Sequence, residues 1–291
     1  MSEPVTSTEK IRRINRNNIF RGTAILTLAG LITRVIGFFY KIFLSKTMGA
    51  ELLGIYQLIF PVYSICFTIF ATGIQTSISR LVAAELVKRN AKNIGKTLRI
   101  SLFLSVSAAL LLSVIVYKGA DYIAWRFLLE ERSASSLRIL AFAFPFCGVT
   151  SCINGYYYGL KKAGVPASTQ LLEQIVRVLV VYLIAVPAGN GKLSVTCELA
   201  LIGLVAGEIA SCIFNFSSLF VAKRPYRLIF QGPDPNAKAS GRKQITKDLL
   251  KLSIPLSANR LLINLLHSVE TVLIPTMLKR FGLSTAAALS T

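Results

Sequence analysis

Two arginines lie inside long apolar stretches of the sequence, where a charge is costly. Arg34 falls within residues 20–44, and Arg260 falls within residues 249–277. Stretches of this length predict membrane-spanning helices, because about twenty residues cross a hydrocarbon core of about 30 Å. A guanidinium placed there costs at least about 2.5–3.5 kcal/mol, so it normally faces a polar cavity or a partner. The two arginines therefore indicate a repeated helix that presents a cation to an anionic substrate.

Polar residues continue along the same faces of these two stretches. Lys41 follows Arg34 by seven residues and Asn264 follows Arg260 by four, so each pair shares one helix face. Such a face suits a helix that lines a water-filled cavity, and the fork of arginine can bond two pyrophosphate oxygens at once. The alternative is that the cations snorkel or neutralise acids inside the bundle. We predict the following substrate-binding set: Arg34, Lys41, Arg260 and Asn264.

Four more charged residues in the apolar stretches are candidates for an ion pair or for coupling to an ion. Glu173 precedes Arg177 by four residues, which is the favourable order for an ion pair on a helix. A self-neutralised pair at membrane depth is more often structural, and a functional role stays open. Glu208 and Glu270 have no such local partner. Each either pairs with an arginine across the bundle or couples transport to a proton or a sodium ion.

Other kinds of site find little support in the residue types. His267 is the only histidine, and the five cysteines have no metal-ligand spacing. These patterns predict no metal site, no disulfide framework and no catalytic triad, and no ATP-binding phosphate loop is present. We therefore expect no cofactor and no enzymatic activity. The cysteines are interpreted as small buried side chains.

Composition and charge indicate a membrane protein. Hydrophobic residues make up 53% of the chain, and the mean hydropathy is +0.59, both high for a soluble domain. The formal net charge of +20 could suggest a nucleic-acid-binding protein. The basic residues, however, are spread between the apolar runs instead of forming one patch, which argues against a nucleic-acid partner.

The apolar runs predict an all-α, polytopic bundle in the plasma membrane. Taking the N-terminus as cytoplasmic, 21 of the 33 basic residues fall on the cytoplasmic side, 8 fall outside and 4 lie within spans. This bias predicts a cytoplasmic N-terminus. The first run is too long for a cleaved signal peptide, so we expect it to remain as a helix. Seven spans are predicted, at residues 20–44, 55–79, 98–117, 137–160, 169–188, 197–221 and 249–277.

The same pattern divides the chain into four segments. We expect a cytoplasmic tail at 1–19, a first six-helix lobe at 20–221, a cytoplasmic linker at 222–247, and the start of an incomplete second lobe at 248–291. The linker is the longest polar interruption and contains three of the ten prolines. Residues 78–92 predict a short amphipathic extension that lies on the inner membrane surface.

Three blocks of sequence carry a family resemblance. They are GLITRVIGFFYKIFLSKTMGAELLGIYQLIFP (residues 30–61), FATGIQTSISRLVAAEL (70–86) and NGYYYGLKKAGVPASTQLLEQIVRVLVV (154–181). These blocks closely resemble the stage V sporulation protein B group of polysaccharide exporters. That group belongs to the multidrug/oligosaccharidyl-lipid/polysaccharide (MOP) flippase superfamily, which also contains the lipid II flippases.

The resemblance implies a fold of two six-helix bundles, like that of the MATE multidrug exporters, of which this chain holds the first and the opening of the second. It also implies a flippase that moves a polyprenyl-pyrophosphate-linked saccharide by alternating access, with partners among cell-envelope synthesis proteins. The sequence departs from the lipid II flippases at Tyr40, where they have a second arginine six positions after the one matching Arg34. The adjacent Lys41 is the candidate substitute.

Two other functions stay open. A cation-coupled drug exporter should have a pocket rich in acids and aromatics, whereas the excess charge inside these spans is basic. A non-transporting membrane scaffold for cell-envelope or spore assembly has no need for Arg34 and Arg260 in one cavity.

Overall fold

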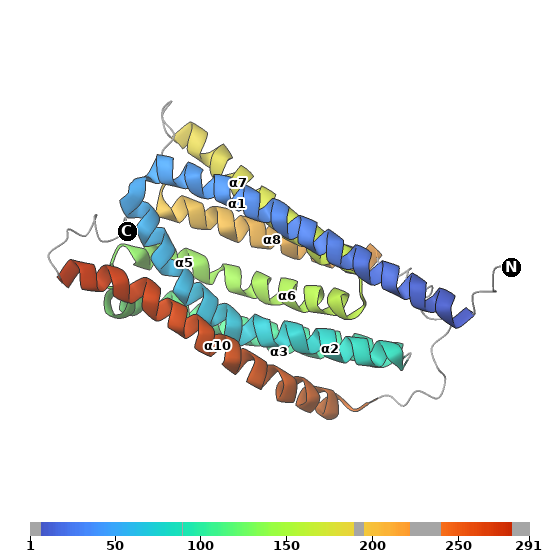
Figure 1. The fold of residues 1–291 in the computed structure, drawn as a ribbon. Coiled ribbons are helices and arrows are strands. Elements are labelled where there is room, and N and C mark those ends of the chain that lie inside the picture. Colours follow the sequence, from blue (N-terminus) through green and yellow to red (C-terminus); the bar gives the residue numbers. More distant parts are fainter. Residues whose placement is uncertain (1–6, 89, 189–194, 222–239, 281–291) are drawn as a thin grey trace.

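The computed structural model describes the backbone of residues 7–88, 90–188, 195–221 and 240–280, and the side chains of 22–88, 90–185, 195–221 and 240–269. Within these ranges every regular element is helical (Figure 1). The predicted tail at 1–19 and most of the predicted linker lie outside the described side chains, as does Glu270. The elements are α1 (Ser7–Phe67), η1 (Thr68–Thr72), α2 (Gly73–Val87), α3 (Ala91–Lys118), α4 (Ala120–Ile123), η2 (Ala124–Leu128), α5 (Ser133–Ala141), α6 (Ala143–Gly159), α7 (Gly164–Ala188), α8 (Cys197–Val221) and α10 (Arg242–Arg280).

The long apolar helices make this a multi-pass membrane protein. In the described part of the chain, five helical segments are long and apolar enough to span a membrane, or six if the bent pair α5 and α6 counts as one. The first segment, Gly22–Val87, has 66 residues and is about 100 Å long by helical rise, far more than one crossing needs. Figure 1 shows it turning back on itself, so it accounts for the first two of the seven predicted spans.

The turn between the first two spans differs from the prediction. The sequence suggested two helices separated by residues 45–54, but the structure runs them together as α1. Only Gly49 leaves helical geometry, with φ of 80° and ψ of 167°. A positive φ carries little steric cost for glycine, which explains how one residue can turn the chain without a loop.

The second half of α1 contains an irregular stretch. Pro61 lies inside the helix, and the π-helical turn η1 follows it before α2 continues the same span. Such turns leave carbonyl groups that need other donors. Neighbouring helices supply them: Ser105 Oγ donates to the Phe70 carbonyl at 2.6 Å, and Ser257 Oγ donates to the Thr68 carbonyl at 3.3 Å. The irregular turn is thus stabilised by α3 and α10.

The first part of the extension predicted at residues 78–92 is the end of α2, which continues the second span. Its place at the membrane surface stays a prediction. Its apolar residues Ile78 and Val82 are fully buried, because α6 comes very close to it. A Cβ atom at Gly155 would lie 2.5 Å from the Gln75 carbonyl oxygen, and one at Gly159 would lie 2.7 Å from Val82 Cβ. The Gly-x-x-x-Gly spacing of these two glycines permits this close approach of the helices.

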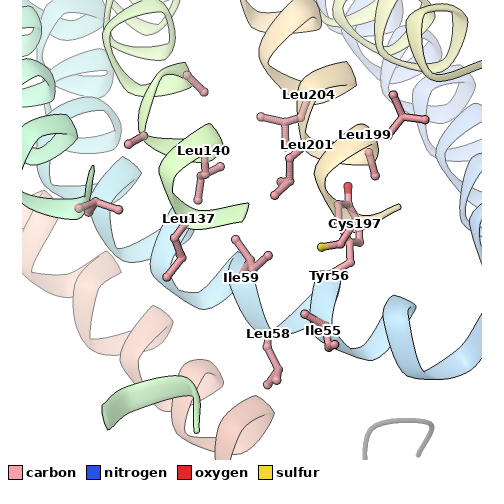
Figure 2. Packing of buried hydrophobic residues seen from close by; sticks show 14 of the residues in the cluster. Ile55, Tyr56, Leu58, Ile59, Leu137, Leu140, Cys197, Leu199, Leu201 and Leu204 are labelled. Carbon is pink, nitrogen blue, oxygen red and sulfur yellow. The ribbon is translucent and has the colours of Figure 1, made fainter. Parts of the chain in front are cut away.

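Apolar side chains from α1, α5 and α8 pack together in the interior. Figure 2 shows Ile59 of α1 between Leu137 and Leu140 of α5 and Leu201 and Leu204 of α8, with Ile55 further along α1 near Tyr56. All five cysteines are buried and unbridged, which confirms their interpretation as small interior side chains. Helix association inside a bilayer depends on this kind of close contact, because lipid tails are as apolar as the side chains.

The two ends of the bundle have different polarity. We call one the basic end: there the beginning of α3 meets the beginning of α10, and Gly22 lies beside Ala163 of the α6–α7 turn. At the opposite end Arg132 forms ion pairs with Glu51 and Glu130, at 2.8 and 2.7 Å. These hydrogen bonds raise the pKa of Arg132 above its usual value. Exposed aromatic side chains also gather at that opposite end: Tyr117, Tyr122, Trp125, Phe127 and Phe142.

Candidate substrate-binding site

A polar cavity of about 510 Å³ lies between the two halves of α1 and helix α10. Lys41 of the first span and Asn264 of the seventh, two of the four predicted substrate-binding residues, both line it. The second span supplies the wall of the cavity between these two residues, and no pattern in the sequence predicted that wall. The remaining lining residues are Gln57, Phe60, Pro61, Tyr63, Ser64, His267 and Ser268.

The cavity forms where α10 packs against the irregular part of the second span. Asn264 Nδ2 donates to Thr68 Oγ1 at 2.6 Å and to the Ser64 carbonyl at 3.3 Å. Asn264 therefore has a structural role as well as a place in the cavity wall. The sequence pointed to Asn264 by its helical spacing from Arg260, but nothing in the sequence indicated that its partner would be the turn after Pro61.

Arg34 and Arg260 are both exposed, and the residues lining the polar cavity include neither of them. They do lie on the same helix faces as residues that line it. Arg34 precedes Lys41 by seven residues, and Arg260 precedes His267 by seven, so each shares a face with its partner. Helices α1 and α10 both run from the basic end, which places both arginines on the basic-end side of the cavity. Their meeting in one cavity stays a prediction.

An apolar groove adjoins the polar cavity. It has a volume of about 460 Å³ and shares Pro61 and Ser268 with the cavity. The rest of its wall is apolar and comes from α1, α4, η2 and α10: Val62, Ile65, Cys66, Ile123, Phe127, Leu128, Leu265 and Val269. A molecule with a polar head and an apolar tail could place one part in each compartment.

A separate group of charged residues is buried inside the bundle. Arg177 donates a hydrogen bond to Glu173 on α7, so the predicted ion pair is present. Glu208 of α8 is buried within electrostatic reach of both residues. Its carboxylate accepts a hydrogen bond from the Tyr63 hydroxyl at 3.3 Å. Among the residues that the structure describes, Arg177 Nε has no hydrogen-bond partner. Functional roles for these residues stay predictions.

Two glycines of α8 make this group compact. A Cβ atom at Gly203 would lie 2.9 Å from the Arg177 carbonyl oxygen, and one at Gly207 would lie 2.8 Å from the Glu173 carbonyl oxygen. The Gly-x-x-x-Gly spacing of Gly203 and Gly207 is the signal that could have located this contact. In the described residues no cluster of three or more potential metal ligands occurs.

Comparison with known proteins connects this geometry to a family. A sequence model of the polysaccharide biosynthesis protein family matches residues 19–281. The chain is 26% identical over 276 residues to stage V sporulation protein B of Bacillus subtilis, covering 94% of this chain and 52% of that protein. It is 22% identical over 268 residues to the lipid II flippase MurJ of the same organism, covering 88% and 49%. The chain thus spans about half the length of these relatives.

Solved structures show the same fold. A MATE transporter in the straight conformation superposes with a TM-score of 0.70 at 19% identity, covering 84% of this chain and 53% of that one. A MOP superfamily transporter from Pyrococcus furiosus superposes with a TM-score of 0.69 at 18% identity, covering 84% and 52%. The predicted all-α MOP/MATE-like fold is confirmed.

Proposed function

Because the chain belongs to the polysaccharide biosynthesis protein family, we propose that it contributes the first lobe and the opening of the second lobe of a lipid-linked saccharide flippase. The substrate is a polyprenyl-pyrophosphate-linked precursor of peptidoglycan or another polysaccharide. In this proposal residues 20–221 form the first lobe, residues 222–247 link the lobes in the cytoplasm, and residues 248–291 begin the second. The N-terminus lies in the cytoplasm, and cell-envelope synthesis proteins deliver or receive the substrate.

The observation that carries this proposal is the polar cavity with an apolar groove at its side. Lys41, Asn264 and His267 supply polar contacts on one side of Pro61 and Ser268, and the groove supplies an apolar surface on the other. A polar cavity beside an apolar groove fits an amphiphilic molecule with an anionic head and an apolar tail. Arg34 and Arg260 extend the polar faces toward the basic end, where the head would enter from the cytoplasm. Arginine suits a pyrophosphate because its planar guanidinium stays protonated and can donate hydrogen bonds to two oxygens at once.

A binding experiment tests the role of Arg34. Farnesyl pyrophosphate serves as a short probe that combines an isoprenyl chain with a pyrophosphate. We expect Arg34→Ala to weaken its binding to the purified protein about tenfold or more, since a hydrogen bond to a charged group contributes about 1.5–3 kcal/mol. Arg34→Lys should recover only part of the affinity, because an ammonium cannot form the bidentate contact. In liposomes, Arg34→Ala should also abolish translocation of a lipid-linked saccharide at normal protein levels.

Lys46→Ala provides the matched control. Lys46 is an exposed cation on the same helix, does not line the cavity and lies off the face of Arg34. Its replacement should leave probe binding unchanged. Equal losses in the two variants would indicate a general charge effect, and normal translocation by Arg34→Ala would refute the proposed role of Arg34 in binding the substrate.

One observation favours the alternative of a cation-coupled drug exporter. Glu173 and Glu208 place two carboxylates beside Arg177 in the interior, where a proton or a sodium ion could bind. An exporter of organic cations should bind ethidium and release it in exchange for that ion. Ethidium binding that Glu208→Gln abolishes, without any binding of farnesyl pyrophosphate, would select this alternative.

A further inference from the structure

A second polar cleft lies at the basic end, far from the substrate cavity. One part, of about 540 Å³, lies between residues 96–104 of α3 and the first turn of α10, and a second part, of about 600 Å³, is an open surface groove along α10 alone. The two parts share Arg242 and Thr246, so we treat them as one feature and call it the basic cleft. Thr246 and Asn264 are about 27 Å apart along α10 by helical rise, which separates the basic cleft from the substrate cavity.

Along α3, the wall of the basic cleft changes from charged to apolar. Its six cations come from the beginnings of the two helices: Lys96, Arg99, Arg242, Lys243, Lys247 and Lys251. Ile100, Phe103 and Leu104 follow on α3, which runs away from the basic end. Phe103 is 73% exposed, so a large apolar side chain faces outward directly below the cations. This order matches a lipid with its head at the surface and its chains in the bilayer.

Hydrogen bonds hold the two walls of the basic cleft in place. Asn93 Nδ2 donates to Ser240 Oγ at 3.1 Å, and the Ser240 amide donates back to Asn93 Oδ1 at 3.0 Å. Lys96 Nζ donates to the Ser240 carbonyl at 3.2 Å. These bonds fix the beginning of α10 against the beginning of α3. Two helix N-termini therefore lie together, and their partial positive charges add to those of the side chains.

Among the residues whose side chains the structure describes, the acids nearest the basic cleft do not cancel its charge. Asp248 accepts a hydrogen bond from Gln244 at 2.9 Å. Glu85 forms an ion pair with Lys88 and accepts a hydrogen bond from Asn93. Neither acid is among the residues that line the cleft. The resulting positive field attracts an anion, and phosphate is the anion that a membrane surface provides.

We propose that the basic cleft binds an anionic glycerophospholipid such as phosphatidylglycerol. Its phosphate lies between Arg99 and Arg242, and its acyl chains lie along Phe103 and Leu104. Basic pockets between membrane helices commonly hold such headgroups. The lipid bridges α3 and α10, and so it stabilises the docking of α10 against the preceding helices.

Native mass spectrometry of the purified protein tests this proposal with phosphatidylglycerol and phosphatidylcholine as probes. We expect phosphatidylglycerol to be retained at least tenfold more than phosphatidylcholine, and to raise the melting temperature. The double variant Arg99→Gln with Arg242→Gln should lose about tenfold or more of that retention and most of the thermal shift. The control Arg80→Gln with Lys161→Gln removes the same charge from exposed positions that line neither part of the cleft, and it should behave like the wild type.

Each other outcome counts against the proposal. Equal retention of the two lipids, or an equal loss in the control, would show that any basic surface suffices. Full competition by inorganic phosphate at equal concentration would identify a free-anion site without a role for the acyl chains. Should the double variant fold poorly without lipid, Thr246→Glu places a negative charge in the cleft without removing either arginine. Retention of phosphatidylglycerol at the wild-type level by folded Thr246→Glu would overturn the assignment.

Discussion

At the scale of single residues, the charged residues within the membrane-spanning helices form two groups with different surroundings. Glu173, Arg177 and Glu208 are enclosed by α7 and α8, and they have protein partners. Arg34 and Arg260 are exposed on the faces that lead to the polar cavity. A charge that is already paired inside the bundle suits a structural role, whereas an exposed arginine at membrane depth suits a ligand.

The ion pair on α7 gives the residue-scale prediction. We expect Glu173→Gln to reduce the folded protein in the membrane, because an unpaired buried arginine costs on the order of 3 kcal/mol. The double variant Glu173→Gln with Arg177→Gln should recover much of the loss. Size-exclusion profiles of the detergent-extracted protein measure both effects. Glu198→Gln, which changes an exposed acid on α8, should stay within about 0.5 kcal/mol of the wild type.

A different result would reassign the pair. If Glu173→Gln folds normally but no longer translocates substrate, the pair belongs to the transport machinery and not to the scaffold of the bundle.

At the scale of elements, two features bring the helices close together. One is small residues at the contacts, and the other is polar side chains that donate hydrogen bonds to the backbone carbonyls of irregular turns. Helix α6 contacts α2 through Gly155 and Gly159, and α10 contacts α2 at Gly73, where an added Cβ atom would lie 2.5 Å from the Ser253 carbonyl oxygen. The hydroxyl groups of Ser105 on α3 and Ser257 on α10 each donate a hydrogen bond to a carbonyl of the π-helical turn. Together these contacts position the second span, which forms one wall of the polar cavity.

The glycines supply the element-scale prediction. Gly155→Ala should destabilise the protein by about 1–3 kcal/mol, because the new methyl group meets the backbone of Gln75, which has little freedom to move. Gly95→Ala is the matched control on α3, since a Cβ atom there meets nothing within 4 Å. It should leave the melting temperature unchanged or raise it slightly. Equal decreases in the two variants would mean that close packing at Gly155 contributes little.

The helices and their order could be predicted from the sequence because hydropathy and length determine them directly. The break between the first two spans was expected within residues 45–54, but its confinement to Gly49 could not be predicted, since the residues around it are good helix formers. Lys41 and Asn264 were placed in one site by spacing alone. Tyr63 as a partner of Glu208, and Gln57 in the cavity wall, depend on how the second span rotates after Pro61. Periodicity along one helix carries no information about that rotation.

At the scale of the whole molecule, the bundle has a basic end and an end with exposed aromatic side chains. The beginning of α3, the α6–α7 turn and the beginning of α10 lie at the first, and Trp125, Tyr122 and Phe127 are exposed at the second. Cytoplasmic segments are typically rich in lysine and arginine, and tryptophan and tyrosine gather at membrane interfaces. The arrangement favours an orientation with the basic end in the cytoplasm.

Cysteine labelling gives the whole-molecule prediction. In a background with the five native cysteines changed to alanine, Glu131→Cys should react with an impermeant maleimide added to intact cells. Gly241→Cys should react only after the membrane is permeabilised. Both positions are exposed and lie at opposite ends of the bundle. The reverse pattern would invert the orientation and with it the direction of transport.

The turn at Gly49 also bears on how the chain enters the membrane during synthesis. The first two spans are joined without a hydrophilic loop, so they must partition into the bilayer as one helical hairpin. Arg34 alone would penalise insertion of the first span. In a hairpin, the favourable insertion free energy of the second span offsets that cost, because its residues 55–71 carry no charge. By joining the two spans directly, Gly49 thus allows the apolar second span to promote the insertion of the first span, which carries Arg34.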